Sequence, residues 1–229
     1  LAQKAADPAN KVMIVCNPHN PIGRVWTRNE LTRVCEICRD NNVLLISDEI
    51  HGDIVYAPHT FTPMMTVAAE VRAKAVACVS PAKTFNIPGM IDAFVVAPDE
   101  AIRTQFHDFA HRYQTNKTNV FAAAAIEAAY RDGAEWLDAL LIYLKGNIEF
   151  MQRYFAEHIP QVSVVPLEGT YLAWVDFTGL EMDAKVLATF IAQDAGIAVS
   201  PGYWFGREGA GFARGNIACP RSTLEQALL

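Results

Sequence analysis

VMIVC at residues 12–16, VLLIS at residues 43–47 and AVACVS at residues 75–80 are three short apolar runs, each bounded by polar residues. Runs of this length, rich in β-branched side chains, are typical of strands that are buried on both faces. Between the first two runs, residues 27–41 carry apolar side chains at helical spacing behind a Thr-x-x-Glu capping box. Buried strands that alternate with helices predict an α/β fold with a mostly parallel central sheet and helices on both faces.

The pattern changes after Pro160, where short strands replace long helical stretches. We therefore expect a large α/β domain at residues 1–133, a connecting helix at residues 134–159 and a smaller α+β domain at residues 160–229. The remaining expected helices lie at residues 101–113, 119–132, 182–194 and 222–229, and the remaining expected strands at residues 93–97, 162–165, 171–175 and 211–218.

Composition excludes several classes of protein. Of the 229 residues, 52% are hydrophobic and 19% are charged, which is enough apolar material for a core and excludes a disordered chain. The net charge of −6 gives no reason to expect nucleic acid as a partner, and no apolar run is long enough to predict a membrane span. The five cysteines are too few and odd in number for a disulfide framework, so we expect a cytoplasmic protein. Cys35 and Cys38 form a C-x-x-C pair without a second pair nearby, so we interpret them as ordinary helix residues.

Polar clusters follow the first three predicted strands. They are NPHNPIGR at residues 17–24, DEIH at residues 48–51 and SPAKTFN at residues 80–86. Each has a simple structural explanation, respectively a turn, a cap on the turn that follows Asp48, and a solvated lysine. Ligands of parallel α/β sheets bind beyond the carboxyl ends of the strands, however, and three such clusters at equivalent ends predict a single site.

Longer runs around these clusters resemble a known family. NPHNPIGRVWT at residues 17–27, ISDEIHGDIVY at 46–56 and SPAKTFNIPGM at 80–90 are similar to the pyridoxal 5′-phosphate (PLP) enzymes of the class I/II aminotransferase superfamily. EGTYLAWVDF at 168–177 and GFARGNIACPRSTLEQAL at 211–228 fit the same branch, which is that of the cystathionine β-lyase-like C–S lyases. The resemblance covers the whole chain and implies the aspartate aminotransferase-like fold.

The resemblance implies roles for six residues. Lys83 matches the lysine that binds PLP covalently, and a lysine suits this role because desolvation or nearby positive charge readily lowers its pKa. Asp48 matches the carboxylate that holds the proton on the PLP ring nitrogen, which lets the ring accept electrons. Asn20 matches the amide that binds the phenolic oxygen of PLP, and Ser80 a hydroxyl near its phosphate. His51 takes the place of a tyrosine that many aminotransferases direct at the same phenolic oxygen.

The sixth residue, Arg214, matches the arginine that binds the α-carboxylate of the substrate, and only a guanidinium offers two parallel N–H donors to that group. Arg221 is a competing candidate, but Pro220 before it indicates the entry of a helix. The sequence also departs from the family. Ile91 occupies the position, eight residues after the lysine, where many aminotransferases bind the phosphate with an arginine.

Several functions are compatible with these residues. The first is a C–S β-lyase that cleaves cystathionine or cysteine S-conjugates to a thiol, pyruvate and ammonia. The second is an aminotransferase, which uses the same Lys83, Asp48 and Arg214, and the third is an inactive fragment. A metal hydrolase built on residues 48–53 is a distant alternative, because these acids and the histidine are too close in sequence to surround an ion without further ligands. We expect no metal.

The family carries an N-terminal segment with a phosphate-binding loop, and no counterpart is present in this sequence. We expect the chain to be part of a longer homodimeric enzyme, to associate through exposed apolar surface when it is made alone, and then to bind PLP weakly. The other expected partner is a small amino-acid substrate.

Overall fold

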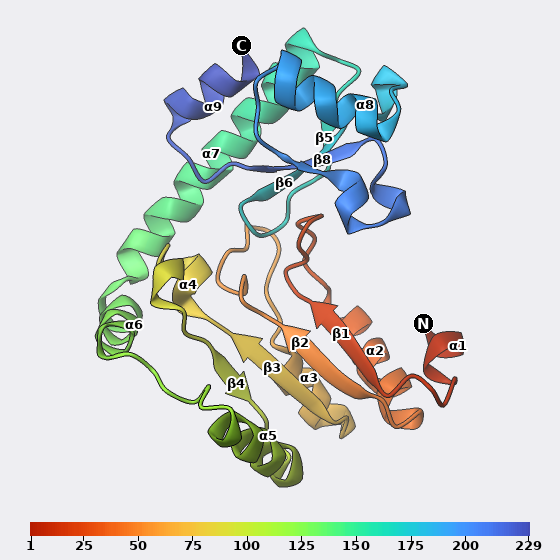
Figure 1. The fold of residues 1–229 in the computed structure, drawn as a ribbon, viewed down its shortest axis with the longest axis vertical. Helices are drawn as coiled ribbons and strands as arrows, with labels where there is room; N and C mark the ends of the chain where they lie inside the picture. The colour runs from red at the N-terminus through yellow and green to blue at the C-terminus, as the bar shows by residue number, and fades with distance from the viewer. The chain divides into compact units, whose positions relative to one another are not determined.

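The computed structural model describes residues 1–229, which form two compact units (Figure 1). The first unit comprises Leu1–Pro18, Val25–Val55 and Thr60–Leu137, and the second comprises His19–Arg24, Tyr56–His59 and Asp138–Leu229. Two short loops near the N-terminus therefore belong to the second unit, together with the C-terminal part of the chain. The domain boundaries expected from the sequence, at residues 133 and 160, stay a prediction.

The first unit is built on a four-stranded sheet in the order β1-β2-β3-β4 (Figure 1). The strands are β1 (Val12–Cys16), β2 (Leu44–Asp48), β3 (Ala75–Val79) and β4 (Phe94–Val96). The first three are parallel, as predicted, whereas β4 runs antiparallel to β3. The segment between β3 and β4 contains only α4 (Pro81–Thr84) and a 3-10 helix at Pro88–Met90. Because a parallel return needs a long crossover, this short segment brings the chain back antiparallel.

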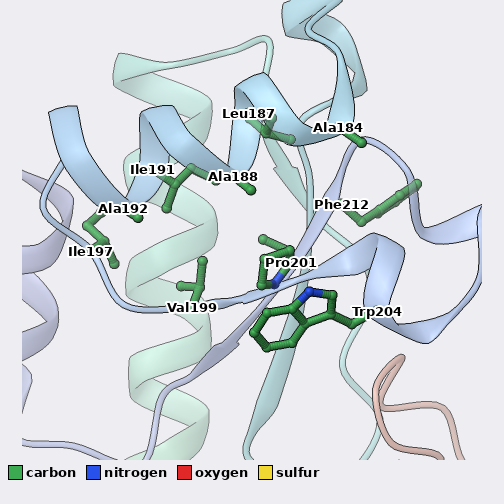
Figure 2. Close-up of a pocket in the computed structure, with 11 residues that line it drawn as sticks. Ala184, Leu187, Ala188, Ile191, Ala192, Ile197, Val199, Pro201, Trp204 and Phe212 are labelled. Carbon is green, nitrogen blue, oxygen red and sulfur yellow. The ribbon is translucent and has the colours of Figure 1, made fainter.

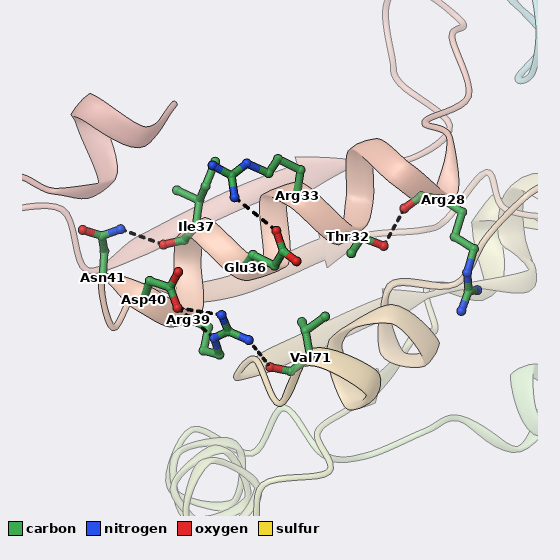
Figure 3. Close-up of polar contacts among 9 residues, drawn as sticks. All are labelled: Arg28, Thr32, Arg33, Glu36, Ile37, Arg39, Asp40, Asn41 and Val71. Atoms are coloured by element: carbon green, nitrogen blue, oxygen red, sulfur yellow. Dashed lines mark hydrogen bonds and ion pairs between the residues drawn. The ribbon is translucent and has the colours of Figure 1, made fainter.

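Helices α2 (Arg28–Asp40) and α3 (Met64–Val71) pack with β1, β2 and β3 in the core of this unit. The capping box at Thr27 starts α2 as predicted, and the buried side chains of α2 are Leu31, Val34, Cys35 and Cys38. Figure 3 shows polar contacts made by α2, among them that of Arg33, whose Nη1 lies 3.1 Å from Glu36 Oε2. Arg39 Nη1 donates to the carbonyl oxygen of Val71 over 3.0 Å and so ties α2 to the end of α3 (Figure 3).

The other helices of the first unit are α1 (Ala2–Ala5), α5 (Glu100–Arg112) and α6 (Val120–Asp132). α7 (Ala134–His158) is the longest helix and ends one residue before the end predicted for the connecting helix. No helix of the structure combines the length and the apolar composition that a bilayer crossing requires.

The second unit has a four-stranded antiparallel sheet in the order β5-β6-β8-β7. Its strands are β5 (Ser163–Val164), β6 (Leu172–Asp176), β7 (Ser200–Pro201) and β8 (Phe212–Asn216). Its helices are α8 (Ala184–Thr189), which continues as a π-helix at Phe190–Asp194, α9 (Arg221–Leu228) and 3-10 helices at Thr178–Leu180, Gly202–Phe205 and Arg207–Gly209. Asn147 of α7 is fully buried, and its Nδ2 donates to the carbonyl oxygens of Ile217 and Cys219 over 3.0 and 3.1 Å. These bonds fix the segment between β8 and α9.

Candidate active site

The carboxyl ends of β2 and β3 lie side by side in the first unit. Asp48, the last residue of β2, pairs in register with Cys78 of β3. The chain continues from β3 through Ser80 into α4, which carries Lys83. The parallel register therefore brings the second and third predicted polar clusters to one edge of the sheet.

Asp48 is half-buried, and its carboxylate accepts a single hydrogen bond. Its Oδ1 accepts one long hydrogen bond, of 3.3 Å, from the backbone N–H of Ile50. This is the local turn that the simple structural interpretation predicts. The carboxylate makes no ion pair, so its other oxygen is open to a cationic partner.

Glu49, next to Asp48, is a buried carboxylic acid that sequence reasoning did not assign to the site. Glu49 is only 6% exposed. Its Oε1 accepts hydrogen bonds from Ser47 Oγ over 2.9 Å and from the backbone N–H of Met64 over 2.8 Å. Met64 is the first residue of α3, whose N-cap residue Pro63 offers no side-chain acceptor. Burial, with a smaller contribution from the charge of Asp48, raises the pKa of Glu49. Glu49 therefore anchors α3 to the strand that ends in Asp48.

His51 is also buried, in the turn that follows Glu49. The turn is closed by backbone hydrogen bonds from Gly52 N to the carbonyl oxygen of Glu49 (2.8 Å) and from Ile54 N to that of His51 (2.9 Å). A Cβ on Gly52 would lie 3.1 Å both from the Glu49 oxygen and from the ring of Phe61. The small residue thus allows this turn to pack closely against its surroundings.

Lys83 lies on α4, a helix of only four residues. Ser80 is the N-cap of α4: its Oγ accepts from Ala82 N over 3.2 Å and donates to the carbonyl oxygen of Asp92 over 2.8 Å. The Lys83 side chain is half-buried and makes no hydrogen bond or ion pair. An amine without an internal partner is unusual for a lysine that is partly removed from solvent, and it is available to a ligand.

The other two predicted residues, Asn20 and Arg214, meet in the second unit. Arg214 Nη1 donates to Asn20 Oδ1 over 2.8 Å, and Nη2 donates to Ser200 Oγ over 3.1 Å. The guanidinium also lies over the ring of Phe205, with its central carbon 4.8 Å from the ring centroid. Ser200 of β7 and Trp174 of β6 are the cross-strand partners of Arg214 on β8, so all three side chains share one face of the sheet.

The loop that carries Asn20 is held by backbone hydrogen bonds. His19 N donates to the carbonyl oxygen of Arg24 over 2.9 Å, and Glu168 N and Gly169 N both donate to that of Gly23, over 2.9 and 2.8 Å. Gly23 has a φ of +77°, a left-handed conformation that favours glycine. The two Asn-Pro turns and the glycine of NPHNPIG therefore fix Asn20 in the second unit.

Arg221, the competing arginine, forms its contacts with α7 residues of the second unit. It is the first residue of α9, as its preceding proline predicted. Its Nε donates to Asn147 Oδ1 over 2.9 Å, and its guanidinium lies 4.6 Å from the ring centroid of Phe150. These contacts give Arg221 a structural role at the start of the helix.

A separate cavity of about 210 Å³ lies in the second unit, between the helix that begins with α8 and the end of the sheet (Figure 2). Its walls are apolar, with Leu187 and Ile191 on the helical side and Pro201 of β7 on the sheet side (Figure 2). Ala213 of β8 also lines the cavity. Arg214 follows Ala213 along the strand and points to the opposite face. The cavity has no titratable side chain in its lining and is not the predicted site.

The structure thus brings together Asp48, His51, Ser80 and Lys83 around two strand ends of the first unit, and Asn20 and Arg214 in the second. Sequence reasoning missed Glu49, Ser200 and Phe205. Glu49 could have been suspected from its position beside Asp48. Nothing local distinguishes Ser200 or Phe205, because their proximity to Arg214 comes from strand pairing and from a loop.

The acidic residues near Asp48 do not assemble into the group that the metal-hydrolase alternative requires. No three side chains of His, Cys, Asp or Glu form a group that could hold a metal ion. Glu49 and Asp53, which the metal-hydrolase alternative would require, instead accept hydrogen bonds from Ser47 and Thr84. A free amine and an open carboxylate at neighbouring strand ends can hold a ligand that offers an electrophilic carbon to the first and a cationic ring nitrogen to the second.

Known proteins are similar to this chain in sequence and in fold. Cystathionine beta-lyase PatB of Bacillus subtilis is 34% identical over 228 residues, which cover 100% of this chain and 59% of PatB. Protein MalY of Escherichia coli is 37% identical over 224 residues, which cover 97% of this chain and 57% of MalY. The crystal structure of cystalysin from Treponema denticola, which contains a PLP cofactor, matches with a TM-score of 0.93 and 33% identity. That match covers 99% of this chain and 58% of cystalysin.

The chain therefore spans 57–59% of the length of these relatives. The likeness in structure confirms the predicted fold, with its mostly parallel sheet and its smaller α+β part. The family described as aminotransferase class I and II matches residues 1–228, which is nearly the entire chain. The chain belongs to the class I and II aminotransferase family.

Proposed function

We propose that the protein is a PLP-dependent C–S β-lyase that cleaves cystathionine or related cysteine S-conjugates to a thiol, pyruvate and ammonia. The observation that carries the proposal is the pair at the ends of β2 and β3, an open carboxylate on Asp48 and a partner-free amine on Lys83. The lyase activity in particular is supported by the likeness to PatB, which is named a cystathionine β-lyase.

The residues of the first unit fit PLP. Lys83 Nζ has no internal partner to give up when it bonds to the aldehyde carbon of the cofactor. Asp48 keeps one oxygen open for the protonated ring nitrogen, and its charge favours that proton. We assign the phenolic oxygen to Asn20 and His51, and the surroundings of the phosphate to Ser80. When bound, PLP supplies an electron sink for the electron pair left at the substrate Cα.

Each residue then has a task in the reaction. Arg214 binds the α-carboxylate of the substrate through two parallel N–H donors, which fixes the amino acid whatever its side chain. With PLP and substrate bound, Lys83 Nζ would serve as the general base that takes the proton from the substrate Cα. Asp48 holds the proton on the ring nitrogen throughout. Loss of the thiolate from Cβ completes the elimination, and the remaining three-carbon unit hydrolyses to pyruvate and ammonia.

Aminotransfer is the closest alternative, and membership of the aminotransferase family favours it. Both reactions use Lys83, Asp48 and Arg214. They differ in the step that follows removal of the proton from the substrate Cα. The test is to incubate the purified protein with cystathionine and no 2-oxo acid and to measure pyruvate. Continuous release of pyruvate over many turnovers is expected for the lyase. Turnover that requires an added 2-oxo acid would make the protein an aminotransferase, and no turnover in either assay would favour the inactive alternative.

We further propose that the protein acts as a homodimer in the cytoplasm. None of the five cysteines forms a disulfide, which fits a reducing compartment. Apolar side chains at both edges of the first sheet are exposed, including Ile14 at 70% and Phe94 at 44%, and such surface favours association. Sedimentation equilibrium is the direct test, and a monomer that is fully active would contradict the proposed dimer.

A further inference from the structure

The helix that carries Lys83 cannot be stable by itself. Four residues form a single turn, and an isolated turn fixes too many dihedral angles for the hydrogen bonds it gains. The direction of the Lys83 side chain must therefore be set by contacts that α4 makes with the rest of the first unit. Ser80 supplies one such contact at the start of the helix, through the carbonyl oxygen of Asp92.

Thr84, the last residue of α4, supplies a second contact. Thr84 is 1% exposed, and its Oγ1 donates a hydrogen bond to Asp53 Oδ2 over 2.8 Å. Asp53 lies five positions after Asp48, in the same turn as His51. This hydrogen bond therefore joins the neighbour of Lys83 directly to the segment that carries Asp48. A hydrogen bond to a charged acceptor is stronger than one between neutral groups, which suits it to a positioning role.

Phe85, directly after α4, is fixed by an aromatic cluster. Its ring meets Tyr130 edge-on at 5.6 Å between centroids and lies 6.1 Å from Trp136. A Cβ on Gly133 would lie 2.5 Å from the Phe85 ring, so the glycine leaves the space that the ring fills. Burial, and then the charge of Asp53, raises the pKa of Tyr130.

We propose that Thr84 and Asp53 are positioning residues, whose hydrogen bond sets the direction of Lys83 relative to Asp48. The inference rests on the proposed function, in which Lys83 bonds to PLP. Asp53 touches neither cofactor nor substrate in this role and acts through Thr84 and α4. Without the bond, α4 would remain attached at Ser80 and Phe85 but would be free to turn about these two points.

The test uses Thr84→Val, which keeps the shape of the side chain and removes the hydroxyl, and Thr84→Ser, which keeps the hydroxyl. Each purified protein is incubated with limiting PLP and reduced with borohydride, which fixes a pyridoxyl group on lysine as a stable secondary amine. Peptide mass mapping then gives the extent of labelling at Lys83 relative to that at Lys74. Lys74 is an exposed lysine before β3 and serves as the internal reference. We expect Thr84→Val to lower the Lys83-to-Lys74 ratio at least about tenfold, since a hydrogen bond to a charged group is lost, and Thr84→Ser to restore most of it.

Asp53→Asn and Asp53→Ala provide a second pair in case Thr84→Val does not fold. Asparagine keeps an oxygen that can accept from Thr84, so its labelling ratio should lie between those of the wild type and of Asp53→Ala. Wild-type labelling in Thr84→Val and Asp53→Ala, with only a lower melting temperature, would overturn the positioning role and leave the proposed function intact. Absence of label on Lys83 in the wild type would overturn the role of Lys83 itself, and this proposal with it.

Discussion

Arg214 and Asn20 are 194 positions apart in the chain, yet Arg214 Nη1 donates to Asn20 Oδ1 over 2.8 Å. Ser200 and Phe205 hold the same guanidinium from other directions. The arginine is therefore oriented before any ligand arrives, and little side-chain entropy remains to be lost on binding. Because the Asn20 amide carries no charge, it does not compensate the positive charge of the Arg214 guanidinium. The attraction of Arg214 for a carboxylate is therefore undiminished.

Arg214→Lys tests this arrangement. The ammonium keeps the charge but offers no planar pair of donors, and the stacking of the guanidinium over the Phe205 ring is lost. We expect KM to rise about 10- to 100-fold for every α-amino acid substrate, on the basis of one or two lost hydrogen bonds to a charged group. The matched control is Arg221→Lys, since Arg221 contacts Asn147 and Phe150 instead, and it should lower stability more than affinity. A variant that loses one substrate and keeps another would assign Arg214 to the side chain rather than to the carboxylate.

Lys83→Ala is expected to remove turnover and the visible absorbance of covalently bound PLP together, because both depend on Nζ. Lys74→Ala, at an exposed lysine of the same unit, is the control and should change neither. Absorbance is measured on the purified proteins after dialysis against PLP-free buffer. Activity close to that of the wild type in Lys83→Ala would remove the central assignment of the site.

Asp48→Asn should leave PLP bound and slow the reaction. The amide cannot stabilise a proton on the ring nitrogen, so the electron sink is weakened while the covalent bond to Lys83 is not. We expect kcat to fall by more than about tenfold, which corresponds to about 1.4 kcal/mol of barrier. Asp108→Asn, at an exposed position of α5, controls for the loss of one negative charge. A smaller decrease in kcat would mean that another group pairs with the ring nitrogen.

Local sequence signals were sufficient for most of the fold. β1 has the predicted bounds, and α7 starts at the predicted residue and ends one residue early. The capping box at Thr27 and the proline before Arg221 mark the starts of α2 and α9. These signals are carried by neighbouring residues and so are readable without the tertiary structure. The resemblance to the family also led to the correct fold, and the roles of the six site residues stay predictions.

What the sequence could not provide depends on residues far apart in the chain. α3 escaped prediction because its first N–H is satisfied by Glu49, fifteen positions earlier, and because Arg72 rather than a glycine takes the left-handed position at its end. The antiparallel direction of β4 and the π-helical turn from Phe190 are likewise set by packing. At the site, the contacts of Arg214 with Ser200 and Phe205 follow from strand pairing and loop geometry, which no local pattern encodes.

Glu49 gives the protein a defined pH dependence. Burial, more than the nearby charge of Asp48, raises its pKa above the ordinary value of 4.5. A folded-state pKa above the unfolded-state value means that the folded protein prefers the protonated acid. Its contribution to stability is therefore fully present below the unfolded-state pKa and is lost as the pH rises through the folded-state pKa.

Glu49→Gln should remove this dependence. The amide oxygen can still accept from Ser47 Oγ and from Met64 N, but the side chain no longer acquires a charge in a buried position. We expect the free energy of unfolding of the variant, relative to the wild type, to increase as the pH rises above the unfolded-state pKa of Glu49 and to level off above its folded-state pKa. The total increase should be about 1.4 kcal/mol for each unit by which the folded-state pKa is raised. Urea unfolding at a series of pH values measures this difference, with Glu135→Gln, on the exposed surface of α7, as the control for net charge. A difference that is constant across the series would show that Glu49 titrates alike in the folded and unfolded protein, and that its role is confined to the two hydrogen bonds at the start of α3.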